Sequence, residues 1–219
     1  MRQTTGVALM VLAATVLWAD ESRQRTFHFS KDNVGKVPAG WKAEKTGTGE
    51  GSIWKVVEDD TAPSKAGYVL AQTAESPNNL FNICVAEDTS YTDVELSVSF
   101  KPIAGKNDQG GGFVWRYRDH DNYYIARANP AGQKGTSFAV YKVVDGKRSA
   151  LQSTSVTKIP VGEWHQLRVT MTGDHMECYL DGKKLLDAKD TTFPNAGKVG
   201  LWSKSDAQTH FDDFKVSGK

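Results

Sequence analysis

Residues 163–189 read EWHQLRVTMTGDHMECYLDGKKLLDAK, and this stretch decides the fold. Apolar and polar residues alternate twice in it, over residues 167–172 and again over residues 175–180. The two runs are separated by Gly173-Asp174, and the second is followed by Asp181-Gly182, a dipeptide typical of tight hairpin turns. A period of two places alternate side chains on one face of a strand. The stretch therefore predicts consecutive antiparallel strands joined by short turns.

The same alternation extends through the rest of the chain. Residues 93–101 (DVELSVSFK) alternate strictly, residues 138–144 (FAVYKVV) end in Asp145-Gly146, and residues 199–203 form another short apolar run. Helical periodicity is nearly absent. Many short strands separated by Gly, Asp and Pro turns predict an all-β fold, a sandwich or jelly roll of two antiparallel sheets. No repeat or long linker divides the chain, so a single domain is expected over residues 20–219.

The first 19 residues predict a signal peptide. Arg2 is followed by the uncharged run VALMVLAATVLWA (residues 7–19), and the polar stretch DESRQR begins directly after it. The run is shorter than the about 20 apolar residues that span a bilayer. Cleavage after Ala19 would leave a periplasmic or secreted chain with no stable membrane insertion. An uncleaved membrane anchor is the alternative.

Charge and cysteine content narrow the function classes. The chain has 219 residues, with 27 Lys and Arg against 26 Asp and Glu, and Arg2 is the single charge of the leader. The remaining chain is neutral, which argues against nucleic acid or an anionic membrane as the partner. Cys84 and Cys178 each lie in a strand-like run, so one disulfide bond or two buried thiols are both open. No CxxC or HExxH motif or Cys/His cluster indicates zinc.

Four segments in order resemble one known family: GGGFVWRYRDHDNYYIARANP (110–130), VYKVVDGKR (140–148), residues 163–190 and AGKVGLWSKSDAQTHFDDFKV (196–216). They resemble the concanavalin A-like, laminin-G-like jelly rolls, and more narrowly the 3-keto-disaccharide hydrolase domains that are often labelled family-16-glycoside-hydrolase-like. The resemblance implies a jelly-roll β-sandwich with one bent sheet whose concave face handles an oligosaccharide or glycoside. The fold carries lectins, hydrolases and adhesion modules alike.

One departure from the family-16 hydrolases bears on the chemistry. Those enzymes use an E-x-D-x-x-E strand, whose carboxylates point into one cleft. The nearest stretch here is residues 91–95 (YTDVE), in which Tyr91 replaces the leading Glu and the trailing Glu is missing. Retaining hydrolysis by two such carboxylates is therefore not supported.

The segment 113–127 predicts a ligand-binding sheet face. If residues 119–122 form a four-residue loop, parity sorts the side chains of the two flanking strands. The core face then holds Phe113, Trp115, Tyr117 and Tyr124. The other face holds Arg116, Arg118, Tyr123 and Arg127. Guanidinium groups bind hydroxyls or carboxylates, and a tyrosine ring stacks on sugar C–H faces. An exposed face whose Arg stems cover apolar surface is the alternative.

Two further groups of residues belong to the expected site. Asp108 and Gln109 precede three glycines, which let backbone approach a ligand, and Asn129 ends the returning strand. Trp202, Lys204 and Asp206 form the second group, with Trp202 as a stacking platform or a core residue. For the glycine-rich stretch, a flexible loop without a ligand is the alternative.

A metal is expected at one position only. The related jelly rolls often hold a structural calcium with an Asp of the final strand, which implies Asp212 as its ligand. The alternative is that Asp212 pairs with a neighbouring loop. No motif requires a cofactor.

Three functions remain open from the sequence. The first is cleavage of 3-keto-glycosides by elimination, with Asp108 or Asp206 as the base and Arg116 or Arg127 polarising the ketone. The second is a non-catalytic, lectin-like module on the same face. The third is a structural or adhesion module without a small ligand.

Overall fold

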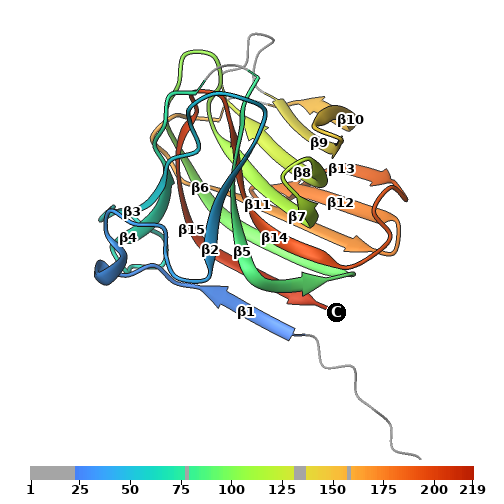
Figure 1. The fold of residues 1–219 in the computed structure, drawn as a ribbon, viewed down its shortest axis with the longest axis horizontal. Helices are drawn as coiled ribbons and strands as arrows, with labels where there is room; N and C mark the ends of the chain where they lie inside the picture. The colour runs from blue at the N-terminus through green and yellow to red at the C-terminus, as the bar shows by residue number, and fades with distance from the viewer. Residues whose placement is uncertain (1–22, 77–78, 131–136, 157–158) are drawn as a thin grey trace, which may run out of the picture.

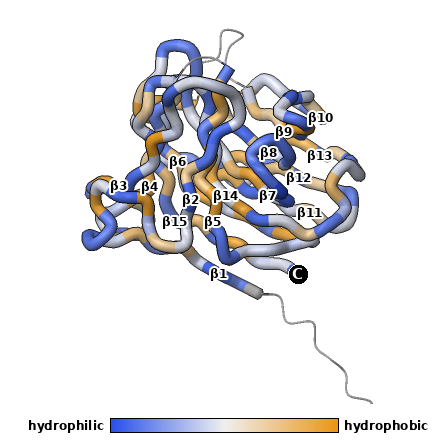
Figure 2. Tube along the Cα trace, viewed as in Figure 1, coloured by the Kyte–Doolittle hydropathy of each residue, from blue (hydrophilic) through white to orange (hydrophobic). Residues whose placement is uncertain are grey.

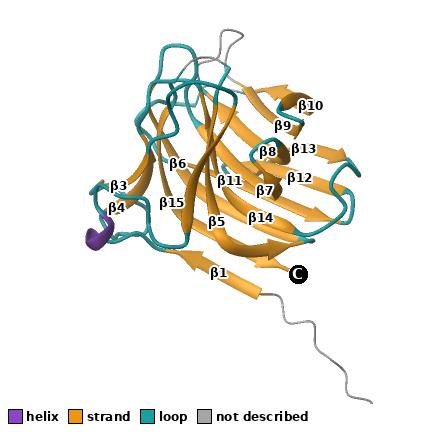
Figure 3. Cartoon of the chain, in the orientation of Figure 1, coloured by secondary structure: helices purple, strands orange, loops and turns teal. Residues whose placement is uncertain are grey.

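The computed structural model describes residues 23–219 except 77–78, 131–136 and 157–158, so the expected signal peptide at residues 1–19 lies outside the described residues. Two antiparallel β-sheets make up the described chain, together with one short 3-10 turn, η1 (Lys31–Asn33) (Figures 1 and 3). The expected all-β sandwich is confirmed. Among the described residues, no helix is long and apolar enough to cross a bilayer.

Sheet A contains eight strands of the described chain. Their order is β13-β12-β11-β6-β15-β4-β3, and β1 pairs with β15 beside this path. The strands are β1 (Arg23–Phe27), β3 (Trp54–Glu58), β4 (Tyr68–Gln72), β6 (Val94–Ala104), β11 (His165–Thr172), β12 (His175–Leu180), β13 (Lys183–Lys189) and β15 (Gln208–Gly218).

Sheet B contains seven strands of the described chain in the order β10-β9-β8-β7-β14-β5-β2. The strands are β2 (Trp41–Thr46), β5 (Phe81–Tyr91), β7 (Gly111–Asp119), β8 (Asn122–Asn129), β9 (Ser137–Val144), β10 (Lys147–Ser155) and β14 (Gly197–Lys204). Strand β14 lies between β7 and β5, so it brings the C-terminal third of the chain beside the central hairpin.

The inner faces of the two sheets enclose one hydrophobic core. Figure 2 shows hydrophobic and hydrophilic residues alternating along the strands, and this alternation decides which side chains face inward. In β11, Leu167, Val169 and Met171 are buried, as the period of two predicts. Trp115 of sheet B is fully buried and donates its Nε1–H to the Met171 sulfur at 3.0 Å. Each large apolar side chain buried in this way contributes about 1.5–3 kcal/mol.

The two cysteines lie in this core as free thiols. Cys84 belongs to β5 of sheet B and Cys178 to β12 of sheet A. Burial raises the pKa of both thiols, that of Cys178 to about 12. Neither thiol is therefore a nucleophile at neutral pH.

Sheet B carries a second hydrophobic cluster on its outer face. Its buried members are Phe81, Ile83, Val85, Val114, Tyr117, Tyr123, Ile125, Val143 and Trp202. Side chains from strands far apart in the sheet meet over this face. The Arg148 guanidinium of β10 lies 5.0 Å from the Phe81 ring of β5, and the Thr46 hydroxyl of β2 lies 2.6 Å from the Tyr123 hydroxyl of β8. Such contacts require the sheet to curl, so we call this outer face the concave face.

Candidate functional site

A buried group of charged and polar side chains lies on the concave face. Oδ1 of Asp108, just before β7, accepts hydrogen bonds from Arg127 Nη2 and, at 3.1 Å, from Asn129 Nδ2. Its Oδ2 accepts a hydrogen bond from Lys204 Nζ at 2.6 Å. Asp108 is 4% exposed and Arg127 is 6% exposed. We call these four residues the Asp108 group. Buried ion pairs add little net stability, so a buried charged group outside the core is a candidate functional site.

A second arginine and several aromatic rings adjoin the Asp108 group. The Arg127 guanidinium carbon lies 5.7 Å from the centre of the Trp202 ring. The Arg148 guanidinium carbon lies 5.9 Å from the same ring, 4.5 Å from the Tyr141 ring and 5.0 Å from the Phe81 ring. Burial lowers the pKa of Arg148, and the positive charge of Arg127 lowers it further. The face therefore combines aromatic rings with cationic hydrogen-bond donors. Trp202 is fully buried, so it packs beneath the two arginines and does not form the exposed stacking platform that the sequence offered as one alternative.

Asp206 lies beside this group and holds the loop that carries Asp108. Its carboxylate accepts backbone N–H groups from Lys106 at 2.7 Å and from Asn107 and Asp108 at 3.1 Å each. Burial alone would raise the pKa of Asp206, but these backbone donors outweigh it and lower the pKa. Asp206 thus fixes the position of Asp108 through the backbone.

Gln109 and Asn129 link the same loop to β8. The Gln109 backbone N–H donates to Asn129 Oδ1 at 3.1 Å, while Gln109 Nε2 donates to the Gly105 carbonyl at 2.9 Å. Gln109 Oε1 is buried and has no hydrogen-bond partner among the described residues. It is an acceptor available to a ligand hydroxyl.

The structure places Arg116 away from this site, and the expected sorting of β7 is wrong at that point. Arg116 lies in a β-bulge with φ of 45°, where the register with β8 shifts between Trp115 and Asp119. Its Nε, Nη1 and Nη2 donate to backbone carbonyls of Thr92, Phe193 and Gly173 at 2.9, 2.7 and 2.6 Å. The guanidinium therefore joins three loops instead of facing a ligand.

The bulge also moves Tyr117 to the other face. Tyr117 was expected in the core with Trp115, but it lies on the concave face with Tyr123, at 5.7 Å between ring centres. An extra residue in a bulge reverses the parity of every residue that follows it. Tyr123 lies on the concave face, as expected, and is fully buried. Burial raises the pKa of both tyrosines.

Two pockets open near the β7–β8 turn, at the opposite end of β7 from Asp108. The larger of the two, of about 550 Å³, lies between the end of β2 and the turns β7–β8 and β9–β10. The smaller, of about 240 Å³, has Val85 and Tyr117 of the concave-face cluster among its lining residues. Glu44 and His120 line both pockets, and no residue of the Asp108 group lines either.

The sequence analysis missed Arg148 and Tyr141. A signal for them exists, because the Asp145-Gly146 turn sets the register in which Arg148 pairs with Val143. Val143 in turn pairs with Tyr123 of the concave face. The two-residue turn therefore predicts that Arg148 shares the face of Tyr123.

Asp212, the expected calcium ligand, is buried in β15 and contacts a loop. Its Oδ2 accepts the Ser64 backbone N–H at 2.8 Å. Among the described residues, Asp212 belongs to no group of three or more acidic, His or Cys side chains with metal-ligand spacing. A calcium ion at Asp212 would therefore depend on backbone carbonyl oxygens, and its presence stays a prediction.

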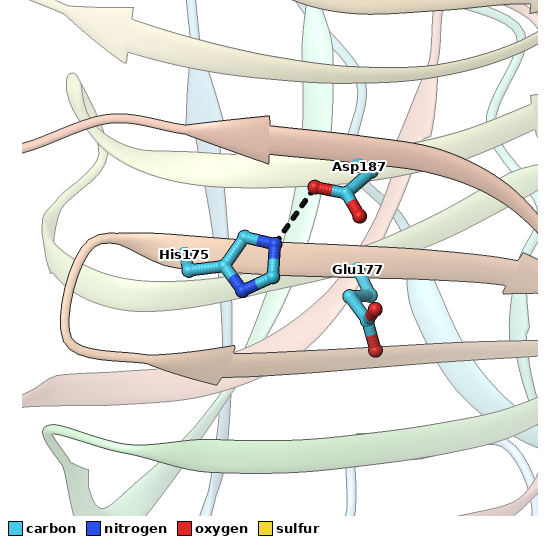
Figure 4. A group of neighbouring side chains, drawn as sticks. All are labelled: His175, Glu177 and Asp187. Atoms are coloured by element: carbon cyan, nitrogen blue, oxygen red, sulfur yellow. Dashed lines mark hydrogen bonds and ion pairs between the residues drawn. The ribbon is translucent and has the colours of Figure 1, made fainter.

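The group with metal-ligand spacing in the described chain is His175, Glu177 and Asp187, on β12 and β13 of sheet A (Figure 4). His175 Nε2 lies 2.7 Å from Asp187 Oδ1. Lys184 Nζ donates to Glu177 at 2.7 Å and to Asp187 at 3.1 Å. Because Lys184 already pairs with both carboxylates and His175 with one of them, we interpret this group as a surface ion-pair network.

Comparison with known proteins assigns the chain to a family. The model of the 3-keto-alpha-glucoside-1,2-lyase-like domain matches residues 29–217. The chain belongs to this family. A comparison with curated proteins gives no match. The family resemblance in the sequence is thereby confirmed.

Solved structures share the fold at low sequence identity. The carbohydrate binding module CBM66 from Bacillus subtilis has a TM-score of 0.63 at 20% identity, covering 80% of this chain and 94% of that one. Domain 4 of AbnA, an extracellular arabinanase of Geobacillus stearothermophilus solved with arabinotriose, has a TM-score of 0.55 at 14% identity, covering 91% and 94%. A Bacillus subtilis protein of unknown function with a galectin-like fold has a TM-score of 0.55 at 11% identity, covering 82% and 90%. The family model identifies a carbohydrate-related domain, and these neighbours share its jelly-roll fold.

Proposed function

We propose that this chain binds a glycoside on the concave face of sheet B and eliminates the aglycone when the sugar carries a 3-keto group. The observation that carries the proposal is the buried Asp108 group, which places a carboxylate between cationic donors outside the core. The family model supports the reaction class. The carbohydrate-binding module and the arabinanase domain with arabinotriose support a carbohydrate ligand.

The proposed reaction needs a base and a group that stabilises an enolate. Asp108 takes the proton from C2, which the neighbouring C3 ketone makes acidic. The electron pair of the C2–H bond moves to the C3 oxygen, where Arg127 or Lys204 stabilises the negative charge. When the ketone re-forms, the electrons make a C1–C2 double bond, the C1–O bond breaks, and the aglycone oxygen takes up a proton. Addition of water to the double bond would complete a hydrolysis.

The contacts of each candidate guide our choice between the residues that the sequence left open. Asp206 is occupied by three backbone donors and Arg116 by three backbone carbonyls. Asp108 and Arg127 contact one another on the concave face. We therefore assign the base to Asp108, the polarising role to Arg127, and a positioning role to Asp206.

One observation favours a non-catalytic, lectin-like module as the second candidate. Both oxygens of Asp108 already accept hydrogen bonds, so the carboxylate must release Asn129 or Lys204 before it can take a proton. A binding module would use the same residues only to hold sugar hydroxyls, with the partly exposed Tyr141 ring as an apolar surface. It requires no proton transfer.

The experiment is release of p-nitrophenol from p-nitrophenyl 3-keto-glucosides of both anomeric configurations. We expect turnover by the purified chain and a loss of at least about 100-fold in kcat for Asp108→Asn. The matched control is Glu177→Gln on sheet A, which should keep full turnover. Binding without turnover would support the lectin-like module instead. If the chain neither binds nor turns over these glycosides, both candidates are contradicted and the structural module is favoured.

Export and calcium remain proposals of their own. We propose that the chain is secreted or periplasmic after cleavage before Asp20, which the mass of the protein isolated from that compartment would test. We propose calcium at Asp212 as a structural ion only. If EDTA lowers the melting temperature of the natural chain but not that of Asp212→Asn, calcium at Asp212 is supported. If the natural chain melts at the same temperature with and without EDTA, calcium is contradicted.

A further inference from the structure

The charges on the concave face do not balance. The Asp108 group joins one carboxylate to two cations, Arg127 and Lys204. Arg148 adds a third cation beside it, and the charged side chains of the described chain that act on Arg148 are Arg127 and Asp108. Since Asp108 already pairs with two cations, Arg148 has no carboxylate of its own among the described residues. Arg148 is half-buried, and a cation that loses part of its hydration without gaining a counter-charge carries a cost that a ligand of opposite charge removes.

Two buried donors at this place make no hydrogen bond of good geometry within the described part of the chain, Arg148 Nη1 and Trp202 Nε1. The Trp202 N–H lies close enough to the Tyr123 hydroxyl to lower the pKa of that tyrosine, whereas Arg148 Nη1 has no such neighbour. Both are donors, and Arg148 and Trp202 adjoin one another at 5.9 Å. An unpaired buried donor costs about 1–3 kcal/mol. The missing group is therefore an acceptor.

The Arg148 guanidinium is held in place by rings instead of hydrogen bonds. It lies over Tyr141 at 4.5 Å and over Phe81 at 5.0 Å. Stacking fixes its plane, and the side chain as a whole stays partly exposed, so a ligand on the concave face can approach the guanidinium. A planar guanidinium edge matches the two oxygens of a carboxylate.

We propose that the concave face selects an acidic glycoside, one whose sugar carries an anionic substituent bound by the Arg148 guanidinium beside the Trp202 ring. This inference rests on the proposed glycoside binding and adds the class of substrate. A carboxylate, as in a uronic acid, and a sulfate share the required anionic oxygens. The planar edge of Arg148 favours the carboxylate.

The experiment is calorimetric titration of the whole chain with three phenyl glycosides of the same sugar frame. They are phenyl β-glucoside, phenyl β-glucuronide and phenyl β-glucoside 6-sulfate. We expect the glucuronide to bind at least tenfold more tightly than the glucoside, and that preference to disappear in Arg148→Met. Trp202→Phe, which removes the indole N–H and keeps a ring, should reduce the preference without abolishing binding of the glucoside.

Arg168→Met is the matched control. Arg168 lies on sheet A with its guanidinium 3.7 Å from the Tyr179 ring, so it reproduces the stacking outside the site. This variant should keep the preference for the glucuronide. A melting temperature for each variant shows that it folds, and Arg148→Gln replaces Arg148→Met if the latter does not.

The outcomes separate this inference from the proposed function. Equal affinity for glucoside and glucuronide would overturn the acidic substrate and leave glycoside binding intact. Tighter binding of the sulfate than of the glucuronide would support an anionic ligand and overturn the preference for a carboxylate. No binding of any of the three glycosides, together with no turnover of 3-keto-glucosides, would overturn both proposals.

Discussion

Asp108 on the concave face of sheet B and Asp59 beside sheet A are both buried carboxylates with cationic partners. They differ in how many of the polar groups around them are hydrogen-bonded. Asp59 Oδ2 contacts Lys101 Nζ at 2.5 Å and His210 Nδ1 at 2.7 Å. Its Oδ1 accepts from the backbone N–H and the hydroxyl of Thr61 at 3.1 and 2.6 Å. Lys101 Nζ also donates to the Thr61 hydroxyl at 2.9 Å and lies over the Trp164 ring at 5.0 Å. Here one cation and one carboxylate balance.

The comparison separates a structural group from a functional one. Around Asp59, the Trp164 Nε1–H also donates to the Thr61 hydroxyl, at 3.0 Å. Around Asp108, Arg148 Nη1 finds no partner within the described chain, and the Trp202 Nε1–H makes no hydrogen bond of good geometry there. A complete network stabilises the fold, whereas an incomplete one carries a cost that only a ligand removes.

The largest expected effect is on the Asp59 side. Lys101→Met leaves the Asp59 carboxylate buried without its cation, so the free energy of unfolding should fall by about 3–5 kcal/mol. Chemical denaturation measures this directly. The control is Lys215→Met, whose partner Asp213 lies 3.3 Å away in an exposed pair, and it should change stability by less than about 0.5 kcal/mol. Equal, small changes in both variants would contradict the structural role of the Asp59 group.

A smaller effect on the same side is the response to acid. Burial alone would raise the pKa of Asp59, but hydrogen bonds from Lys101, Thr61 and His210 outweigh it and hold the pKa well below its usual range. Burial lowers the pKa of His210, and the Asp59 carboxylate only partly opposes this shift. As the pH falls, each of the two groups is protonated at a higher pH in the unfolded chain than in the folded chain.

Stability should therefore fall between about pH 7 and pH 5 because of His210, and again below about pH 4 because of Asp59. Denaturation curves at pH 7 and pH 5 for the natural chain and for His210→Gln isolate the first step. The variant should lose less stability than the natural chain over this interval. An identical loss in both would show that His210 does not contribute.

The smallest expected effect has the opposite sign and lies on the Asp108 side. Arg148→Met removes a half-buried cation that has one unpaired buried donor, and it keeps an apolar side chain between the rings. It should raise the free energy of unfolding by about 1 kcal/mol in the absence of ligand. Arg168→Met should give no such gain. A loss of stability in Arg148→Met would mean that the two groups do not differ as described.

The sequence predicted the sheets well because alternation and tight turns act locally. The periods of two in β11 and β12 and the Gly173-Asp174 turn between them are reproduced. The parity of Phe113, Trp115 and Tyr124 is reproduced as well. Local pattern is sufficient there because a single register buries all the apolar residues.

The site could be predicted only in part, because the features that the prediction missed depend on contacts between residues far apart in the sequence. The bulge at Arg116 depends on Gly197 of β14, where a Cβ atom would lie 2.4 Å from the Arg116 carbonyl carbon. Nothing in the local sequence of β7 indicates that contact. The pairing of Asp108 with Lys204 likewise joins residues 96 positions apart. Arg148 was readable from its turn, but its meeting with Phe81 depends on the curl of the whole sheet.

The most direct test of the central claim is a ¹⁵N–¹H spectrum of the tryptophan indole groups during titration with phenyl β-glucuronide. Trp202 represents the concave face and Trp164 the Asp59 side, and Trp202→Phe and Trp164→Phe assign the two signals. The account predicts that the Trp202 Nε1–H signal shifts with ligand while the Trp164 signal stays in place. A shift of Trp164 with no change in Trp202 would contradict it and place the ligand on sheet A.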